Sequence, residues 1–78
     1  MATTAVITDT AEILASYKRY WLLRANLGLT DKEVIEKAEV TNRSIINWRK
    51  GIAVPREKAL YKIANTLGVK VSDFFEGG

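Results

Sequence analysis

The sequence predicts an all-α domain built from four to five short helices. Apolar residues recur at three- and four-residue spacing in four segments, and capping residues or glycines bound each segment. No segment alternates apolar and polar residues for long enough to form a convincing strand. In a chain of 78 residues we expect one such domain and no second domain that senses a ligand.

The first helix is expected to begin near Asp9 and to end at Gly28. Asp9, with Glu12 three residues later, is typical of a helix start, and glycine is typical of a helix end. The apolar residues at helical spacing between them are Ile13, Tyr17, Tyr20, Leu23 and Leu27. Residues 1–8 are expected to be a flexible segment, and 9–78 a single domain.

Two shorter helices are expected in the middle of the chain, about three residues apart. Thr30 and Glu33 form a capping-box pattern at the start of the second helix, which runs to about Ala38. Thr41 is a good N-cap for the third helix, which ends at Gly51. The inward residues of this pair are Val34, Ile35, Ala38, Ile45 and Trp48. Such a pair is typical of a helix-turn-helix unit, whose second helix can lie in the major groove of DNA.

A fourth helix is expected between Pro55 and Gly68, because proline favours helix starts and glycine favours helix ends. Its inward residues are Ala59, Leu60, Ile63, Ala64 and Leu67. After it, Ser72 is expected to cap a last turn that carries Phe74 and Phe75 into the core.

Positive charge is concentrated in one section of the chain. Residues 41–62 contain six basic residues and one acidic residue, whereas the rest of the chain contains six basic and eight acidic residues. This distribution indicates a surface that binds a polyanion; the alternative is an ordinary solvated face.

The composition argues against an enzyme. The chain has no histidine or cysteine, so it offers no obvious base to activate Ser16, Ser44 or Ser72. The carboxylates lack the spacing of a metal-binding loop. No catalytic residue, metal, cofactor or small-molecule ligand is therefore expected. Neither a signal-peptide pattern nor a membrane-length apolar stretch is present, so we expect no membrane association and a cytoplasmic location.

From Tyr20 to Phe75 the sequence resembles the Cro and phage-repressor (Xre) family of helix-turn-helix DNA-binding proteins. The first matching segment comprises LTDKEV at 29–34 and VTNRSIINWRKG at 40–51. The second, over 55–75, contains the proline, the leucine-isoleucine-alanine helix, the Leu-Gly-Val ending and the aromatic turn. The resemblance implies a compact lambda-repressor-like domain and a transcription regulator. It favours a repressor, encoded by a phage or mobile element.

Two residues depart from the family pattern. Ile35 stands where the family has alanine or glycine at the close contact between the second and third helices. Glu39 stands where the family has glycine in the turn, so either Glu39 adopts a left-handed backbone conformation at a cost of about 1 kcal/mol or the turn differs from that of the family.

The third helix is expected to read bases. When Ile45 and Trp48 point inward on a helical wheel, the residues on the opposite face are Arg43, Ile46, Asn47 and Lys50. Trp48 is accordingly interpreted as a core residue. Polar residues on this face could instead be ordinary solvated and capping groups.

The residue types on this face suit base edges. Arg43 can donate two hydrogen bonds to guanine, Asn47 can pair with adenine, and Ile46 can contact a thymine methyl group. The resemblance adds Asn42 to the expected base-reading residues, because the family often makes base contacts from the first turn of this helix. Expected phosphate contacts on either side are Thr30, Lys32, Thr41, Arg49 and Arg56. For Lys58 and Lys62, solvation and DNA contact remain alternatives.

The first helix carries an additional apolar patch, formed by Leu14, Trp21 and Leu22. It could serve as a homodimer or partner surface, or residues 1–8, with Val6 and Ile7, could cover it. A homodimer on an operator is expected because one short helix reads too few base pairs alone. The alternative function is a protein-interaction module, such as an antitoxin-like or antirepressor protein, that uses this patch.

Overall fold

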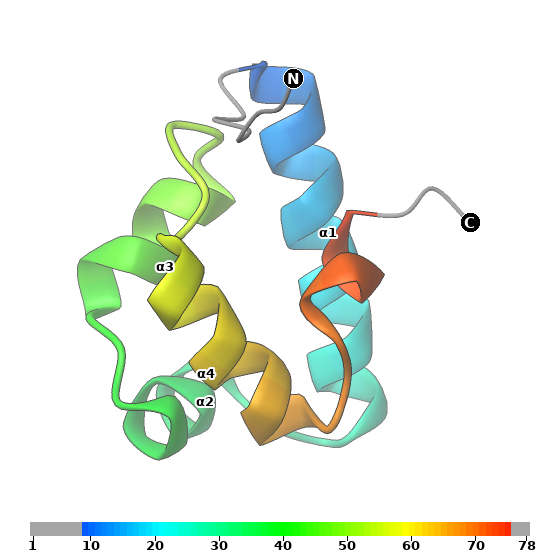
Figure 1. Cartoon of the computed structure of the whole chain (residues 1–78), viewed down its shortest axis with the longest axis vertical. Coiled ribbons are helices and arrows are strands. Elements are labelled where there is room, and N and C mark those ends of the chain that lie inside the picture. The colour runs from blue at the N-terminus through cyan, green and yellow to red at the C-terminus, as the bar shows by residue number, and fades with distance from the viewer. Residues whose placement is uncertain (1–8, 76–78) are drawn as a thin grey trace.

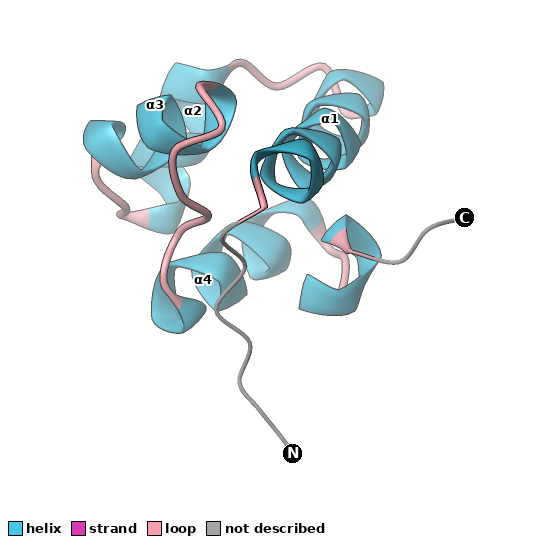
Figure 2. Ribbon diagram, turned by 90° about the horizontal axis from the view of Figure 1, so that it is seen from above, coloured by secondary structure: helices cyan, strands magenta, loops and turns pink. Residues whose placement is uncertain are grey.

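The computed structural model describes residues 9–75, which form four α-helices and one terminal 3-10 turn. The elements are α1 (Thr10–Asn26), α2 (Asp31–Ala38), α3 (Asn42–Arg49), α4 (Glu57–Leu67) and η1 (Val71–Phe74). In Figures 1 and 2, α1 lies along one side, α2 and α3 lie on the other, and α4 packs against α2 and η1. The predicted all-α fold class is confirmed. The predicted flexible segment 1–8 lies outside the described residues.

The predicted helix boundaries agree with the structure. Asp9, Thr30 and Thr41 cap α1, α2 and α3, and each side-chain oxygen accepts a backbone N–H in the first turn. Gly28 follows α1 and Gly68 caps α4, both with left-handed backbones. Polar caps therefore define the starts of α1, α2 and α3, and glycines follow the ends of α1 and α4.

All five elements contribute to one hydrophobic core. Its buried residues are Ile13, Tyr20, Val34, Ala38, Ile45, Trp48, Leu60, Ile63, Ala64, Leu67 and Phe74. The Trp48 ring stacks on Tyr20 at 4.9 Å between centroids and meets Phe74 edge-on at 5.6 Å. Trp48 is thus a core residue, as predicted. The assignment of Leu27 to the apolar face was wrong, because this residue follows the end of α1 and is 52% exposed.

A buried hydrogen bond fixes α3 against α1. The Trp48 indole N–H donates to Ser16 Oγ at 2.7 Å, and the Ser16 hydroxyl donates to the Ile13 carbonyl at 2.8 Å. A buried indole N–H without an acceptor would cost about 1–3 kcal/mol. Ser16 is therefore a structural partner of Trp48, and this contact holds the two helices in register.

A polar network joins the end of α1 to the start of α2. The Tyr20 hydroxyl donates to Asp31 Oδ1 at 2.7 Å, and Arg24 Nε lies 3.1 Å from the same oxygen. Arg24 Nη1 also donates to the Leu29 carbonyl at 2.8 Å. Burial, followed by the hydrogen bond to Asp31, raises the pKa of Tyr20 far above its usual value, so its hydroxyl remains a donor. This network orients α2 relative to α1.

Of the two expected arrangements of the turn, Glu39 adopts the left-handed backbone, with φ 57° and ψ 45°. It is the one non-glycine residue with positive φ among the residues described. Its N–H donates to the Ile35 carbonyl and so closes α2.

Glu39→Gly is therefore expected to stabilise the domain by up to about 1 kcal/mol, because glycine adopts this conformation without steric cost. Thermal melting measures the effect, with Glu36→Gly as the control, since glycine inside α2 should lower the midpoint. A midpoint that falls for Glu39→Gly as well would contradict the expected relief of strain.

The prediction that Ser72 caps the last turn was wrong. Lys70 is the N-cap of η1, and its backbone N–H donates to Asp73 Oδ2 at 3.0 Å. Ser72 lies within the turn and is exposed. The Asp73 carboxylate, at the third position of the turn, stabilises its start. The sequence suggested Ser72 instead because serine is a common N-cap residue.

Candidate nucleic-acid interface

The exposed side of α3 carries the predicted base-reading residues. Ile45 and Trp48 are buried, as the helical wheel requires. One hollow of about 560 Å³, here the α3 hollow, is lined by Asn42, Arg43, Ile46, Asn47, Lys50 and Ile52. The structure therefore brings all five predicted base-reading residues to one surface and adds Ile52.

Ile52 was missed by the sequence analysis because it lies beyond the helix to which the wheel applied. The loop after α3 folds back on the helix: the Ile52 N–H donates to the Asn47 carbonyl at 2.9 Å, and the Ala53 N–H donates to it at 3.3 Å. Ile52 is 62% exposed, the largest fraction among the exposed large apolar residues that the structure describes. The sequence feature that could have indicated Ile52 is an apolar residue directly after the glycine that ends the helix.

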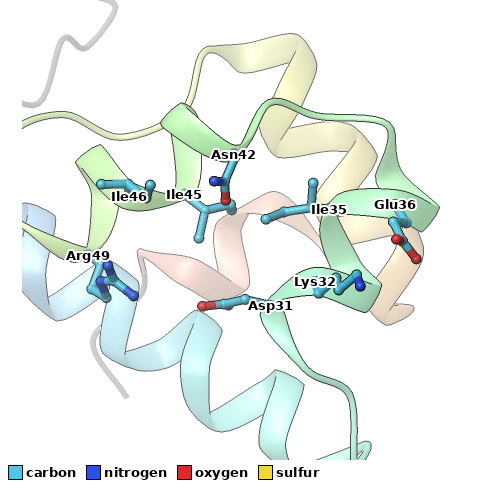
Figure 3. Close-up of a pocket in the computed structure, with 8 residues that line it drawn as sticks. All are labelled: Asp31, Lys32, Ile35, Glu36, Asn42, Ile45, Ile46 and Arg49. Carbon is cyan, nitrogen blue, oxygen red and sulfur yellow. The ribbon is translucent and has the colours of Figure 1, made fainter.

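A second concavity of about 540 Å³, the α2–α3 groove, separates the two helices of the motif (Figure 3). Its lining residues are Asp31, Lys32, Ile35, Glu36, Asn42, Ile45, Ile46 and Arg49. Ile35 is half-buried and contributes to the wall of the groove, where the family pattern has a smaller residue. Two predicted phosphate residues, Lys32 and Arg49, thus share this groove with two carboxylates.

The start of α2 is less open to phosphate than its sequence suggests. The Thr30 N–H and hydroxyl both donate to Glu33 Oε1, at 2.9 and 3.2 Å, and the Glu33 N–H donates to Thr30 Oγ1. These bonds, chiefly that from the Thr30 backbone, hold the pKa of Glu33 below its usual value and keep it charged. A phosphate at Thr30 would therefore meet a carboxylate already bound there, whereas Lys32, two residues further along, lines the α2–α3 groove.

A third hollow of about 240 Å³, the α3–α4 hollow, lies on the other flank of α3. Its lining residues are Glu39, Val40, Thr41, Ser44, Arg56, Lys58, Ala59 and Lys62. The structure thus groups the predicted phosphate residues Thr41 and Arg56 with Lys58 and Lys62. Three cations and one carboxylate make this flank of α3 electropositive.

The apolar patch of α1 is exposed but divided. Leu14, Trp21 and Leu22 are 42%, 45% and 51% exposed. Leu14 and Trp21 are seven residues apart and share one face, whereas Leu22 is turned from Trp21 by about 100°. Arg24 lies over the Trp21 ring, 5.9 Å from its centroid.

Part of the Leu14 side chain also packs against the loop after α3, at Gly51. A Cβ on Gly51 would lie 3.1 Å from Leu14 Cδ2 and 3.0 Å from Thr10 Cγ2, and Gly51 has φ +76°. The loop after α3 therefore needs glycine here, for the backbone angle and for the close approach to α1.

Two further features concern the described residues alone. Across 9–75, no three acidic side chains gather in a way that could hold a metal ion. No helix in that part of the chain is both long and apolar enough to span a membrane.

Comparison with solved structures supports the fold. The restriction-modification controller protein C.AhdI from Aeromonas hydrophila matches with a TM-score of 0.75 and 17% identity, over 83% of this chain and 98% of that protein. The SOS-response transcriptional repressor LexA from Eubacterium rectale matches with a TM-score of 0.74 and 21% identity, over 90% of this chain and 74% of that protein. An HTH_3 family transcriptional regulator from Vibrio cholerae matches at 0.73 and 25%, over 87% of this chain and 38% of that protein. No curated protein matches the sequence.

The family match covers the elements that build the site. The helix-turn-helix family HTH_3 matches residues 22–74, more than half of the chain and the whole of α2, α3 and α4. Together with its lambda-repressor-like fold and the exposed face of α3, this match supports DNA-binding transcription regulation rather than catalysis. The chain therefore belongs to the Cro/C1-type helix-turn-helix family HTH_3.

Proposed function

We propose that the protein is a sequence-specific transcription repressor that occupies an operator in double-stranded DNA as a homodimer. The observation that carries the proposal is the α3 hollow, in which Arg43 and Asn47 lie together with Lys50 and without a carboxylate. Arginine suits the acceptors of guanine, and asparagine suits the donor and acceptor of adenine. With α3 in the major groove, these side chains would read the base edges.

The flanks of α3 supply the phosphate contacts in this proposal. Lys32 and Arg49 line the α2–α3 groove, and Thr41 and Arg56 line the α3–α4 hollow. The three cations would neutralise phosphates on either side of the major groove, and Thr41 would donate a hydrogen bond to one of them. Lys58 and Lys62 would extend the second flank. Thr30 is the weakest of the proposed phosphate residues because Glu33 occupies its N–H and hydroxyl.

Of the two directions of regulation, repression requires fewer contact surfaces on the protein than activation does. A domain that covers an operator can block transcription by occupancy alone, whereas activation also requires a surface that contacts the transcription machinery. The excess of cations in the α3 hollow and the α3–α4 hollow suits DNA. Because the base-reading residues of one α3 span only a few base pairs, two copies on adjacent half-sites would supply the required specificity.

Selection of bound duplexes from a random pool tests the proposal. We expect enrichment of a two-fold symmetric site with half-sites about 10 base pairs apart, one helical turn of DNA. The matched control is the Arg43→Ala/Asn47→Ala double variant, which should enrich no defined sequence. A pool that remains random for the unaltered protein would contradict sequence-specific binding.

Trp21→Ala tests the homodimer, because Trp21 is the largest exposed apolar side chain of the α1 patch. We expect this substitution to weaken self-association by removing buried apolar surface. Sedimentation over a concentration series, with and without operator, measures the effect. Tyr61→Ala, which removes an exposed aromatic ring from α4, is the control. An unchanged dimer in Trp21→Ala would place the interface elsewhere.

A protein-interaction module is the second candidate function. The exposure of Leu14 and Trp21 on one face of α1, with Leu22 beside it, favours this function, since exposed apolar side chains are typical of contact surfaces. An antitoxin-like or antirepressor protein would bind another protein through α1 and bind DNA weakly or not at all. The duplex selection separates the two candidates.

A further inference from the structure

Ile52 lies on the proposed DNA-facing surface without any role in the contacts assigned so far. Its side chain is 62% exposed and lines the α3 hollow together with Ile46. Exposing so much apolar surface at a fixed position is unfavourable in water. The hollow therefore combines hydrogen-bonding groups with an unpartnered apolar element.

The position of Ile52 is defined by its backbone. Gly51 is buried against α1, where Leu14 and Thr10 lie close to its Cα. The Ile52 N–H donates to the Asn47 carbonyl, which ties the loop to the end of α3. These two constraints place the backbone at Ile52 beside α3, and the Ile52 side chain lines the α3 hollow.

We propose that Ile52, together with Ile46, contacts the C5-methyl group of thymine in the major groove and so sets a preference for thymine within each half-site. This inference rests on the proposed function. The thymine methyl is the apolar group that the major groove displays, and it lies next to the donors and acceptors that arginine and asparagine read. A single DNA surface would then occupy the whole α3 hollow.

The charges around Ile52 favour DNA over an apolar protein segment. Arg43 and Lys50 line the α3 hollow, and no carboxylate does. The neighbouring α2–α3 groove differs, since Asp31 and Glu36 accompany its two cations. An apolar peptide would desolvate Arg43 and Lys50 without pairing them, whereas the nearby phosphates of DNA would attract both.

Uracil-substituted duplexes test the thymine contact. In the duplex enriched by the selection, each thymine is replaced in turn by uracil, which lacks only the methyl group. We expect one or two positions per half-site at which the substitution weakens binding about threefold to fivefold, the effect of one buried methyl group. Ile52→Ala should bind the thymine duplex more weakly and should lose sensitivity to uracil at one of these positions.

Tyr61→Ala is the matched control, because Tyr61 is exposed to a similar extent but lies on α4. It should retain the full uracil effect, and thermal melting should show that Ile52→Ala remains folded. A site without any uracil-sensitive thymine would overturn the inference, as would an Ile52→Ala variant with the same sensitivity as the unaltered protein. Failure to enrich any duplex would instead overturn the proposed function, on which the inference rests.

Discussion

Trp48→Ala should lower the free energy of unfolding by about 3–5 kcal/mol, the range for truncating a buried aromatic residue. Trp48 is fully buried, stacks on Tyr20, meets Phe74 edge-on and donates its indole N–H to Ser16. The loss is comparable with the whole net stability of a domain of this size, so most of the variant should be unfolded at room temperature. Urea unfolding followed by the helical circular dichroism signal measures it.

Trp21→Ala is the matched control for this prediction, since it removes the same side chain from an exposed position of α1. At a concentration where the chain is monomeric, it should change stability by about 0.5 kcal/mol or less. Ser16→Ala should fall between the two, at about 1–3 kcal/mol, because it leaves the indole N–H buried without its acceptor. Equal midpoints for Trp48→Ala and Trp21→Ala would contradict the central position of Trp48.

The features that the sequence predicted well are those that local chemistry determines. Thr30 and Thr41 cap helices through hydrogen bonds to residues three positions away, and Gly68 ends a helix through its own backbone angle. The left-handed turn at Glu39 was one of the two conformations that the family pattern left open. The periodicity of α3 also sorted Ile45 inward and its polar residues outward.

The features that the sequence did not predict depend on contacts between distant segments. Trp48 and Ser16 are 32 positions apart, so no local pattern connects the indole with its acceptor. Ile52 joined the α3 hollow because Gly51 packs against α1 and returns the loop to α3. Thr30 suited a phosphate by its position, but Glu33 takes up its donors. In each case three-dimensional packing determined which groups remained available.

Base reading and backbone binding should fail differently when their residues are removed. Arg43→Ala or Asn47→Ala should cost about 1–3 kcal/mol on the selected duplex and relax the preference at one base position per half-site. Lys32→Ala or Arg56→Ala should weaken binding to all sequences, because these cations line the flanks of α3 rather than the α3 hollow. Equilibrium binding to the selected duplex and to single-base variants of it measures both effects.

The salt dependence of binding distinguishes phosphate contacts from base contacts independently of base preference. Each lost phosphate contact should reduce the slope of log affinity against log salt concentration by about one per half-site, whereas Asn47→Ala removes no charge and should leave it unchanged. Lys37→Ala is the matched control for Lys32→Ala, because Lys37 is exposed on α2 but lines none of the three hollows. An unaltered slope in Lys32→Ala or Arg56→Ala would contradict its phosphate role. If Arg43→Ala and Asn47→Ala both left affinity and base preference intact, α3 would not be the helix that reads the bases. The protein-interaction function would then account better for the exposed surfaces of this chain.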